Sequence, residues 1–535
     1  MTGPQTDSAK TVREALSRNV TITIVARVVY LLTRFFVPPF LLARVSMEAY
    51  GLWATAFILV SYVGISTMGL SAVYSKYVAE FSARGEYKRA NQLLSTGLFI
   101  AVPLCAALFA LIYLLWPWLV QYLHVSPRLA LEARVVVLIV IGSFLLSLCT
   151  SAFSDALTGV QMESSNQFIW IVAYLFETAL IFGLVGFGRG IEGLAEAFLL
   201  RTLLEEGLST VVAFRRISWL RISPTLVNRD SLHLICSFGG VVQLTSLFAI
   251  GLNSIERALA APLAGLSASG LLDVSKKLPG MAASIPNAFT SSLTPAASYL
   301  QGSLIEDSPE AQAPIRKLFL KGARYMNLSS AYFCAFIATA SAPILTVWLG
   351  KHYHNAAILA SLFAISTQMH LLTGPGTSLL KGLGRPKEEF YYCIPNVIAL
   401  AVFVPLSYPL FGGWTAVGIA CAVVLSTFVS AAIFIRHANR ILALPAAHYW
   451  KRVVWPGIVP YLVALPFALV LVSTVSLTAR WTGAGIVSLA GIAYTALLTV
   501  VVDRWVFDEG ERLWFRAILH PRFRRAARRA QEVAT

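Results

Sequence analysis

Apolar stretches of about 20 residues or more, separated by short charged or Gly/Pro-rich turns, recur along the whole chain. Such a stretch can cross hydrocarbon only as a helix that satisfies its own backbone hydrogen bonds. The chain is 57% hydrophobic and 13% charged, whereas soluble domains carry about 25% charged residues. The sequence therefore predicts an all-α integral membrane protein with about 14 transmembrane helices. The predicted segments are 19–43, 50–80, 90–118, 133–158, 167–187, 191–213, 232–255, 268–299, 323–349, 355–380, 389–411, 414–436, 453–475 and 484–506.

Lysine and arginine are distributed unevenly between alternate connections. Counted from the N-terminus, one side holds the basic clusters at 84–89, 215–229 and 316–324 and the arginine-rich tail from 504 to 529. The connections of the other side carry few basic residues. Because cytoplasmic loops are enriched in Lys and Arg, both termini are predicted to be cytoplasmic. The net charge of +16 follows from these loops rather than from binding to nucleic acid.

The two halves of the chain contain similar stretches with aligned glycines. Gly51 corresponds to Gly270, and Gly159 to Gly382, at a spacing of about 220 residues. This collinearity predicts two copies of a six-helix unit, which in transporters typically form two lobes around a midplane site. The predicted organisation is a cytoplasmic segment at 1–18, an N-lobe at 19–230 (helices 1–6), a C-lobe at 231–440 (helices 7–12), helices 13–14 at 441–506 and a basic cytoplasmic tail at 507–535.

Arg27 and Arg34 lie inside the first apolar segment. A charge at the centre of a membrane helix costs roughly 2.5–3.5 kcal/mol even on the low scale, so such residues usually serve a function. A spacing of seven residues is two helical turns, which places both guanidinium groups on one face. The pair is predicted to line a water-filled cavity and to bind an anion such as a pyrophosphate. The alternative is that both side chains reach a membrane interface.

Lys276 and Lys277 lie in the predicted segment 268–299 together with Asp273. Asp273 can pair with a lysine at i+3 or i+4, which still leaves net positive charge in the segment. One lysine is predicted to contact an anionic substrate, and the alternative is an interfacial cluster of ion pairs. Arg257, next to Glu256, is a further candidate, although an ion pair between the two at the periplasmic edge is the favoured account.

Lys76 lies at the cytoplasmic end of a predicted helix and is a candidate for attracting the substrate head group. A salt bridge to Glu80, one turn further on, is the alternative. Asp155, Glu177 and Asp273 are candidates for coupling to protons or sodium, because an intramembrane carboxylate can exchange a cation. The alternative for Asp155 and Glu177 is a structural pair with a neighbouring basic side chain.

His370 and Gln368 share one predicted helix and could bind sugar hydroxyls, although a role in hydrogen bonds between helices is the alternative. The numerous aromatic residues are predicted to face lipid or to form interfacial belts, and none is assigned to a substrate. The cysteines have no spacing typical of a metal site. The sequence therefore predicts no metal, no cofactor and no catalytic residue.

Three runs resemble the polysaccharide exporters of the multidrug/oligosaccharidyl-lipid/polysaccharide export superfamily. They are FFVPPFLLARVSMEAYGLWATAF, MGLSAVYSKYVAEFSARGEYKRANQLLSTGLF and LLKGLGRPKEEFYY, and the resemblance covers the first twelve predicted helices. It implies two six-helix lobes in a V around a central cavity. In relatives with fourteen helices, the last pair forms a groove for a polyprenyl tail.

The resemblance implies a flippase rather than an enzyme. The predicted function is translocation of undecaprenyl-pyrophosphate-linked oligosaccharide repeat units across the bacterial inner membrane, from the cytoplasmic to the periplasmic leaflet, by alternating access. The expected partners are the lipid-linked oligosaccharide, membrane lipids and a polysaccharide polymerase with its assembly proteins, but no nucleic acid.

Two other transport functions remain open. A flippase for the peptidoglycan lipid precursor shares the architecture and the cationic cavity. A cation-coupled multidrug antiporter should present acidic residues, whereas the deep charges of this chain are judged to be mainly basic. A membrane glycosyltransferase or polymerase is disfavoured, because the sequence has neither a large loop between its apolar segments nor a DxD motif.

Overall fold

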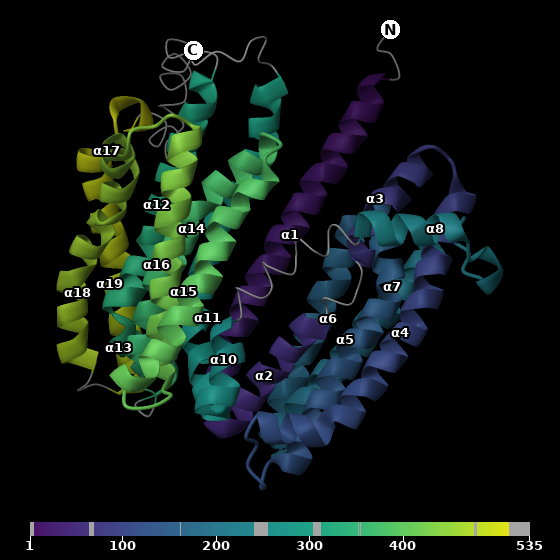
Figure 1. The fold of residues 1–535 in the computed structure, drawn as a ribbon, viewed down its shortest axis with the longest axis horizontal. Helices are drawn as coiled ribbons and strands as arrows, with labels where there is room; N and C mark the ends of the chain where they lie inside the picture. Colours follow the sequence, from purple (N-terminus) through teal and green to yellow (C-terminus); the bar gives the residue numbers. More distant parts are fainter. Residues whose placement is uncertain are drawn as a thin grey trace. The chain divides into compact units, whose positions relative to one another are not determined.

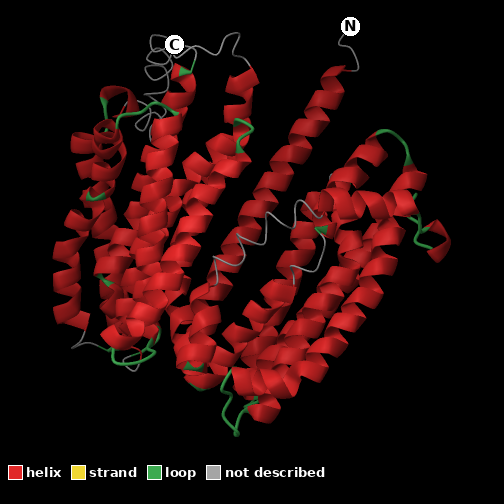
Figure 2. Ribbon diagram, viewed as in Figure 1, coloured by secondary structure: helices red, strands yellow, loops and turns green. Residues whose placement is uncertain are grey.

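The computed structural model describes residues 5–63, 69–160, 162–239, 255–302, 312–350, 353, 355–475 and 479–512. The regular elements of this described part are all helices, as Figure 2 shows. Contacts divide the chain into two compact units. Unit 1 comprises 1–274 and 413–419, and unit 2 comprises 275–412 and 420–535.

Unit 1 is built around α5, which packs against α2, α3, α4 and α7, while α6 packs against α1 and α7 (Figure 1). Short 3₁₀ or π turns occupy Pro224–Leu226 and Ile235–Gly239. The helices are α1 (Gln5–Leu42), α2 (Met47–Val63), α3 (Leu70–Ala83), α4 (Tyr87–Tyr122), α5 (Ala130–Gly159), α6 (Glu163–Gly186), α7 (Gly190–Arg216), α8 (Arg229–Leu234), α10 (Ile255–Ala264) and the first part of α11 (Leu266–Gly302).

Unit 2 is built around α12, which packs against α14 and α18, while α19 packs against α13 and α18. Short 3₁₀ or π turns lie at Pro386–Glu389, Trp450–Val454, Trp455–Gly457 and Val502–Val506. Beyond the rest of α11, the helices are α12 (Ala313–Thr339), α13 (Ser341–Trp348), α14 (Asn355–Gly382), α15 (Phe390–Leu410), α16 (Ala416–Ile441), α17 (Ala446–Tyr449), α18 (Val459–Val475) and α19 (Arg480–Val501).

Nine helices of the described part are long and apolar enough to cross a membrane, or ten if α12 and α13, bent by 76°, form one span. An all-α, multi-pass membrane architecture is thus confirmed, while the predicted count of about 14 spans exceeds what the described helices provide. The predicted segments 50–80, 191–213, 232–255 and 268–299 are not among the candidate spans. Segment 232–255 lies largely outside the described residues, and 50–80 is divided between α2 and α3. The other two correspond to α7 and α11, which carry several charged or polar side chains.

The structure tests only part of what the sequence predicts for the two ends of the chain. Helix α1 begins at Gln5 and so includes most of the segment predicted to precede the N-lobe. The basic tail beyond residue 512 lies outside the described residues. The predicted lobe boundaries and the cytoplasmic location of both termini stay predictions.

Helices α2 and α11 approach each other closely at Gly51 and Gly270, the two glycines that the internal repeat aligns. A Cβ atom on Gly51 would lie 1.7 Å from the carbonyl oxygen of Leu266, and one on Gly270 would lie 2.9 Å from the Gly51 Cα. Beside this contact, the hydroxyls of Thr55 and Ser269 are 3.1 Å apart. Small residues that let two backbones touch, supported by hydroxyl hydrogen bonds, are a typical device of helix packing in membranes.

Replacing Gly51 with Ala is expected to destabilise unit 1 by about 3 kcal/mol or more, because the methyl group would meet backbone atoms that cannot move aside independently. Thermal melting of the detergent-purified variant should show the loss as a lower transition temperature. Gly183→Ala in α6 is the control, since its Cβ would meet nothing within 4 Å. Equal melting temperatures for Gly51→Ala and the wild type would contradict the close approach of the helices.

Candidate functional site

Arginine and tyrosine side chains of α1, α6 and α7 gather in unit 1. The Arg27 and Arg34 guanidinium carbons lie 5.8 and 5.5 Å from the centroid of the Tyr30 ring. Arg34 is also 5.7 Å from the centroid of Tyr174, and Arg201 is 5.0 Å from that same ring. A cation within about 6 Å of an aromatic centroid is attracted by the ring, by about 2 kcal/mol or more where water is excluded. The rings thus hold the three like charges in one cluster, here termed the arginine–tyrosine cluster.

Helical spacing in the sequence produces this convergence. Tyr30 lies three residues after Arg27 and four before Arg34, so the three side chains share a face of α1. Trp170 and Tyr174, four residues apart on α6, have ring centroids separated by 3.9 Å. Because α6 packs against both α1 and α7, the Tyr30 ring reaches 5.9 Å from Trp170 and 6.0 Å from Tyr174.

Three glutamates accompany Arg201 on its other side. Glu177 Oε2 lies 3.6 Å from Arg201 Nε, and Glu205 accepts a hydrogen bond from Arg201 Nη1. Glu206 accepts hydrogen bonds from the hydroxyls of Ser147 and Thr150 on α5, the latter at 2.6 Å. No Lys or Arg of the described residues lies at ion-pair distance from Glu206. Arg201 is therefore neutralised by carboxylates, whereas Glu206 is held by neutral donors only.

The charged residues around Arg201 differ from those that the sequence predicts. The structure gives Glu177 the basic neighbour that its structural alternative required, although its coupling role stays untested. The sequence did not single out Arg201, Glu205 or Glu206. Because two of these three residues are acidic, the interpretation of the deep charges as mainly basic is wrong for unit 1. The sequence did contain a signal, because Arg201 and Glu205 lie four residues apart inside the predicted apolar segment 191–213. The partner of Arg201 on α6 could not be found without knowing that α6 packs against α7.

Asp155 lies near the end of α5 and faces α3. Its Oδ1 accepts hydrogen bonds from the hydroxyls of Ser71 at 2.7 Å and Ser75 at 3.5 Å. Its buried Oδ2 has no hydrogen-bond partner. The basic neighbour of the structural alternative is absent at ion-pair distance within the described part of the chain. Asp155 is thus a buried carboxyl group held by neutral donors, as Glu206 is.

Asp273 forms a second charged group where α2, α10 and α11 meet. Arg257 Nη1 donates to Asp273 Oδ1 at 2.7 Å, and the Tyr50 hydroxyl donates to Oδ2 at 2.8 Å. Arg257 Nε lies 3.9 Å from Glu256, so the adjacent glutamate is the more distant of the two carboxylates. Gly265, with φ of +87°, makes the turn that returns α11 against α10. The sequence predicted Arg257 and Asp273 as separate candidates, and the structure pairs them.

The remaining candidates lie elsewhere. Lys276 Nζ is 5.9 Å from the centroid of the Phe363 ring in unit 2, and Lys277 is half-buried on the next position of α11. Lys76, in unit 1, lies over the ring of Tyr77, with its Nζ 4.6 Å from the centroid, while Glu80 pairs with Arg84 at 2.9 Å. Substrate contact of these lysines stays a prediction.

His370 and Gln368 connect helices of unit 2. His370 Nδ1 lies 2.8 Å from the Tyr392 hydroxyl, and Gln368 Nε2 donates to Asn327 Oδ1 at 2.9 Å. The Tyr461 hydroxyl donates to Gln368 Oε1. These contacts support the alternative interpretation, in which both residues bridge helices.

An apolar cavity of about 330 Å³ lies against α12, α18 and α19 of unit 2. Aromatic and aliphatic side chains dominate its lining, which also includes the acidic residue Glu511. The lining residues are Tyr325, Leu328, Ser329, Tyr332, Phe333, Pro460, Leu498, Thr499, Val502, Phe507 and Glu511.

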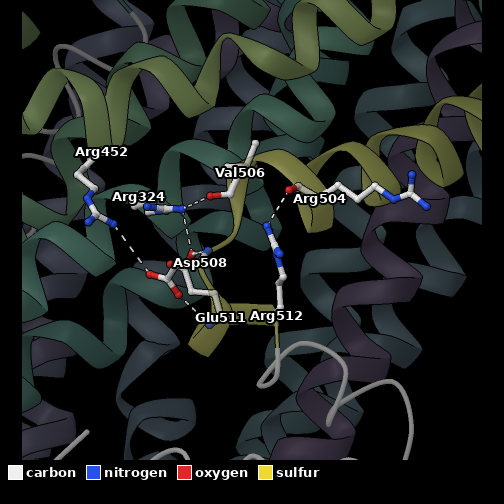
Figure 3. Close-up of polar contacts among 7 residues, drawn as sticks. All are labelled: Arg324, Arg452, Arg504, Val506, Asp508, Glu511 and Arg512. Carbon is white, nitrogen blue, oxygen red and sulfur yellow. Dashed lines mark hydrogen bonds and ion pairs between the residues drawn. The ribbon is translucent and has the colours of Figure 1, made fainter.

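A buried ion pair fixes the end of this helical region (Figure 3). Arg324 of α12 donates to Glu511 Oε2 at 2.9 Å and to the carbonyl oxygen of Val506. Asp508 and Glu511 cap each other's backbone N–H groups reciprocally, at 3.1 and 2.9 Å. Arg512 donates to the carbonyl oxygen of Arg504 at 2.7 Å. These contacts hold the segment after α19 against α12.

Glu511→Gln is expected to cost about 3–5 kcal/mol, because it leaves the buried Arg324 charge without its carboxylate. The measurement is the melting temperature of the detergent-purified protein. Arg452→Ala is the control, since Arg452 is 3.9 Å from Asp508 and both side chains are more than half exposed, so the loss should stay below about 1 kcal/mol. Equal shifts for the two variants would contradict the importance of the buried pair.

The fold is that of transporters with known structures. An inward-facing multidrug resistance MATE-family transporter of the MOP superfamily superposes with a TM-score of 0.62 at 14% identity, over 78% of this chain and 94% of that one. The lipid II flippase MurJ, in an inward closed conformation, gives a TM-score of 0.59 at 13% identity, over 91% and 99%. The chain thus has the fold of MOP-superfamily membrane transporters.

The sequence defines the family more narrowly. Residues 41–358 match the family described as "Polysaccharide biosynthesis protein", and because this match covers more than half of the chain, the protein belongs to that family. It is also 22% identical over 444 residues to the uncharacterized membrane protein EpsK of Bacillus subtilis (strain 168), covering 80% of this chain and 83% of EpsK. The resemblance noted from the sequence is confirmed at the level of the family.

Proposed function

We propose that this polysaccharide biosynthesis membrane protein is a flippase for undecaprenyl-pyrophosphate-linked oligosaccharide repeat units. It would move them from the cytoplasmic to the periplasmic leaflet of a bacterial inner membrane by alternating access of the lobes 19–230 and 231–440. The observation that carries this proposal is the arginine–tyrosine cluster, in which Arg27 and Arg34 lie against aromatic rings in a helix apolar enough to span a membrane.

The charges of Arg27 and Arg34 are available to an anion. In the described part of the chain, no carboxylate lies at ion-pair distance from either side chain, and Tyr30 and Tyr174 approach them through their rings. Arg34 also forms a hydrogen bond with Tyr174, and Glu177 acts on it at longer range. Arg201, by contrast, is already paired with Glu177 and Glu205. A guanidinium group never loses its charge and binds two phosphate oxygens at once. Arg27 and Arg34 are therefore the residues to which a pyrophosphate would bind.

The lipid and protein partners follow from the same proposal. The apolar cavity against α12, α18 and α19 suits part of a polyprenyl chain, since only Glu511 gives its lining a charge. The basic connections would lie on the cytoplasmic side with both termini. A polysaccharide polymerase and its assembly proteins would take the cargo after translocation.

Energy coupling would use a carboxyl group that no basic side chain neutralises. Glu177 and Asp273 each have an arginine partner, which makes them weaker candidates than the sequence indicated. Among the described residues, the hydrogen-bond partners of Asp155 and Glu206 are hydroxyl groups. A buried carboxylate in this situation favours a proton or a metal cation as its counter-charge. Asp155 therefore remains a coupling candidate, and Glu206 joins it.

Other cargoes compete with this proposal. A peptidoglycan lipid precursor offers the same diphosphate to Arg27 and Arg34. A cation-coupled multidrug antiporter is favoured by one specific observation, the group Glu177, Glu205 and Glu206, because acidic side chains attract cationic drugs and coupling ions.

Transport by purified protein in proteoliposomes tests the function directly. The wild type should flip a fluorescent polyprenyl-pyrophosphate oligosaccharide, and Arg27→Ala combined with Arg34→Ala should reduce the rate at least about tenfold, because each charge-assisted contact contributes about 1.5–3 kcal/mol. Arg134→Ala is the matched control, since Arg134 also lies on a tyrosine ring, with its guanidinium carbon 4.8 Å from the Tyr113 centroid. Full transport by the double variant would remove Arg27 and Arg34 from the proposal.

The same liposomes separate the competing functions. Ion-driven efflux of a cationic dye without movement of any lipid-linked glycan would favour the antiporter. A clear preference for the peptidoglycan lipid precursor over lipid-linked repeat units would favour that cargo.

Asp155→Asn is expected to abolish the dependence of flipping on a proton or sodium gradient while leaving the protein folded, because the amide keeps the hydrogen bonds but cannot bind the cation. The readout is the flipping rate with and without an imposed gradient. Asp230→Asn, at an exposed position of α8, is the control. A gradient dependence that survives in Asp155→Asn would exclude this residue and leave Glu206 as the next to test.

A further inference from the structure

One aromatic ring beside the arginine–tyrosine cluster takes no part in its described cation–π contacts. Tyr30, Trp170 and Tyr174 form a trio of rings from α1 and α6, with centroids 3.9 to 6.0 Å apart. Tyr30 and Tyr174 are each approached by two guanidinium groups. Trp170, within the described residues, is the ring of the trio that no guanidinium group approaches.

We infer that Trp170 is a sugar-stacking platform and binds the first pyranose ring of the glycan, next to the diphosphate held by Arg27 and Arg34. This inference rests on the proposed function and names a subsite within it. A pyranose presents a face of C–H groups that packs against an aromatic face, and its hydroxyls then find polar partners at the rim. An indole offers the largest such face, with an N–H at its edge.

The distances fit a ligand in which sugar and diphosphate are directly bonded. The Arg34 guanidinium carbon is 5.7 Å from the Tyr174 centroid, which is 3.9 Å from that of Trp170. The cation therefore lies no more than about 10 Å from the indole. Arg27 is connected to Trp170 in a similar way through Tyr30. A sugar joined to the phosphate through its anomeric oxygen can reach both groups at once.

The surroundings distinguish Trp170 from a lipid-facing belt residue. Trp170 is half-buried and packs against α1 through Tyr30, whereas Phe168, two residues earlier on α6, is 62% exposed. Trp170 lies seven residues from the start of α6, about 10 Å along the axis. In the proposed orientation that end of α6 is cytoplasmic, so the ring lies on the side from which cargo enters.

Binding of two lipids tests the inference. The probes are fluorescent undecaprenyl-pyrophosphate trisaccharide and fluorescent undecaprenyl pyrophosphate without sugar, titrated with the full-length protein in nanodiscs. Trp170→Ala should weaken binding of the trisaccharide lipid about tenfold and leave binding of the sugar-free lipid unchanged, while Trp170→Phe should retain most of the affinity. Trp118→Ala is the matched control, because Trp118 also stacks on a tyrosine four residues later, with centroids 5.6 Å apart.

The outcomes separate failure of the platform from failure of the function. An unchanged affinity of Trp170→Ala for the trisaccharide lipid, with binding lost in Arg27→Ala/Arg34→Ala, would overturn the inference and leave the flippase proposal intact. Equal losses for both lipids in Trp170→Ala would assign the ring to packing of α1 on α6, and would also overturn it. Failure of the wild type to bind either lipid would overturn the proposed function together with the platform.

Discussion

The cost of placing charge in hydrocarbon governs how the polar groups of this protein are arranged. An uncompensated charge inside a membrane helix costs several kcal/mol, and the described helices meet that cost in three ways. Arg257–Asp273 and Arg324–Glu511 are direct ion pairs between elements. Arg27 and Arg34 rest on aromatic rings. In the third way, hydroxyl groups are the described hydrogen-bond partners of the buried carboxyl groups of Asp155 and Glu206.

These three devices differ in what they leave available. A close ion pair satisfies both charges and resists exchange, so it suits a joint between helices. An arginine on a ring keeps its net charge and its N–H donors, and the ring supplies only part of what an anion would. A carboxyl group bound by neutral hydroxyls keeps its affinity for a proton or a cation. The distribution of the devices therefore separates the structural charges of the protein from those suited to function.

Sequence reasoning found the residues whose signal is local and missed those whose partner is remote. Arg27 and Arg34 were predicted because a charge in an apolar helix is visible at once, and helical geometry alone places them on one face. The Arg257–Asp273 pair depends on the turn at Gly265, and Glu177–Arg201 depends on how α6 packs against α7. The predicted segment 191–213 was assigned from its overall hydropathy, which hides the charged residues Arg201, Glu205 and Glu206 within it. The family followed from sequence motifs, whereas the cargo depends on the shape of a site that motifs do not encode.

Among the described residues of unit 1, arginines that lie on aromatic rings coexist with carboxyl groups bound by hydroxyls, and this bears on the choice between a flippase and an antiporter. A purely anionic site would attract cationic drugs, and a purely cationic site would bind a diphosphate too tightly to release it. Here Arg201 lies between the two sets, against Tyr174 on one side and Glu177 and Glu205 on the other. Because Glu177 and Glu205 are already paired with Arg201, they offer a cationic drug less than their number suggests. A coupling cation would bind instead at Asp155 or Glu206, whose partners among the described residues are hydroxyl groups.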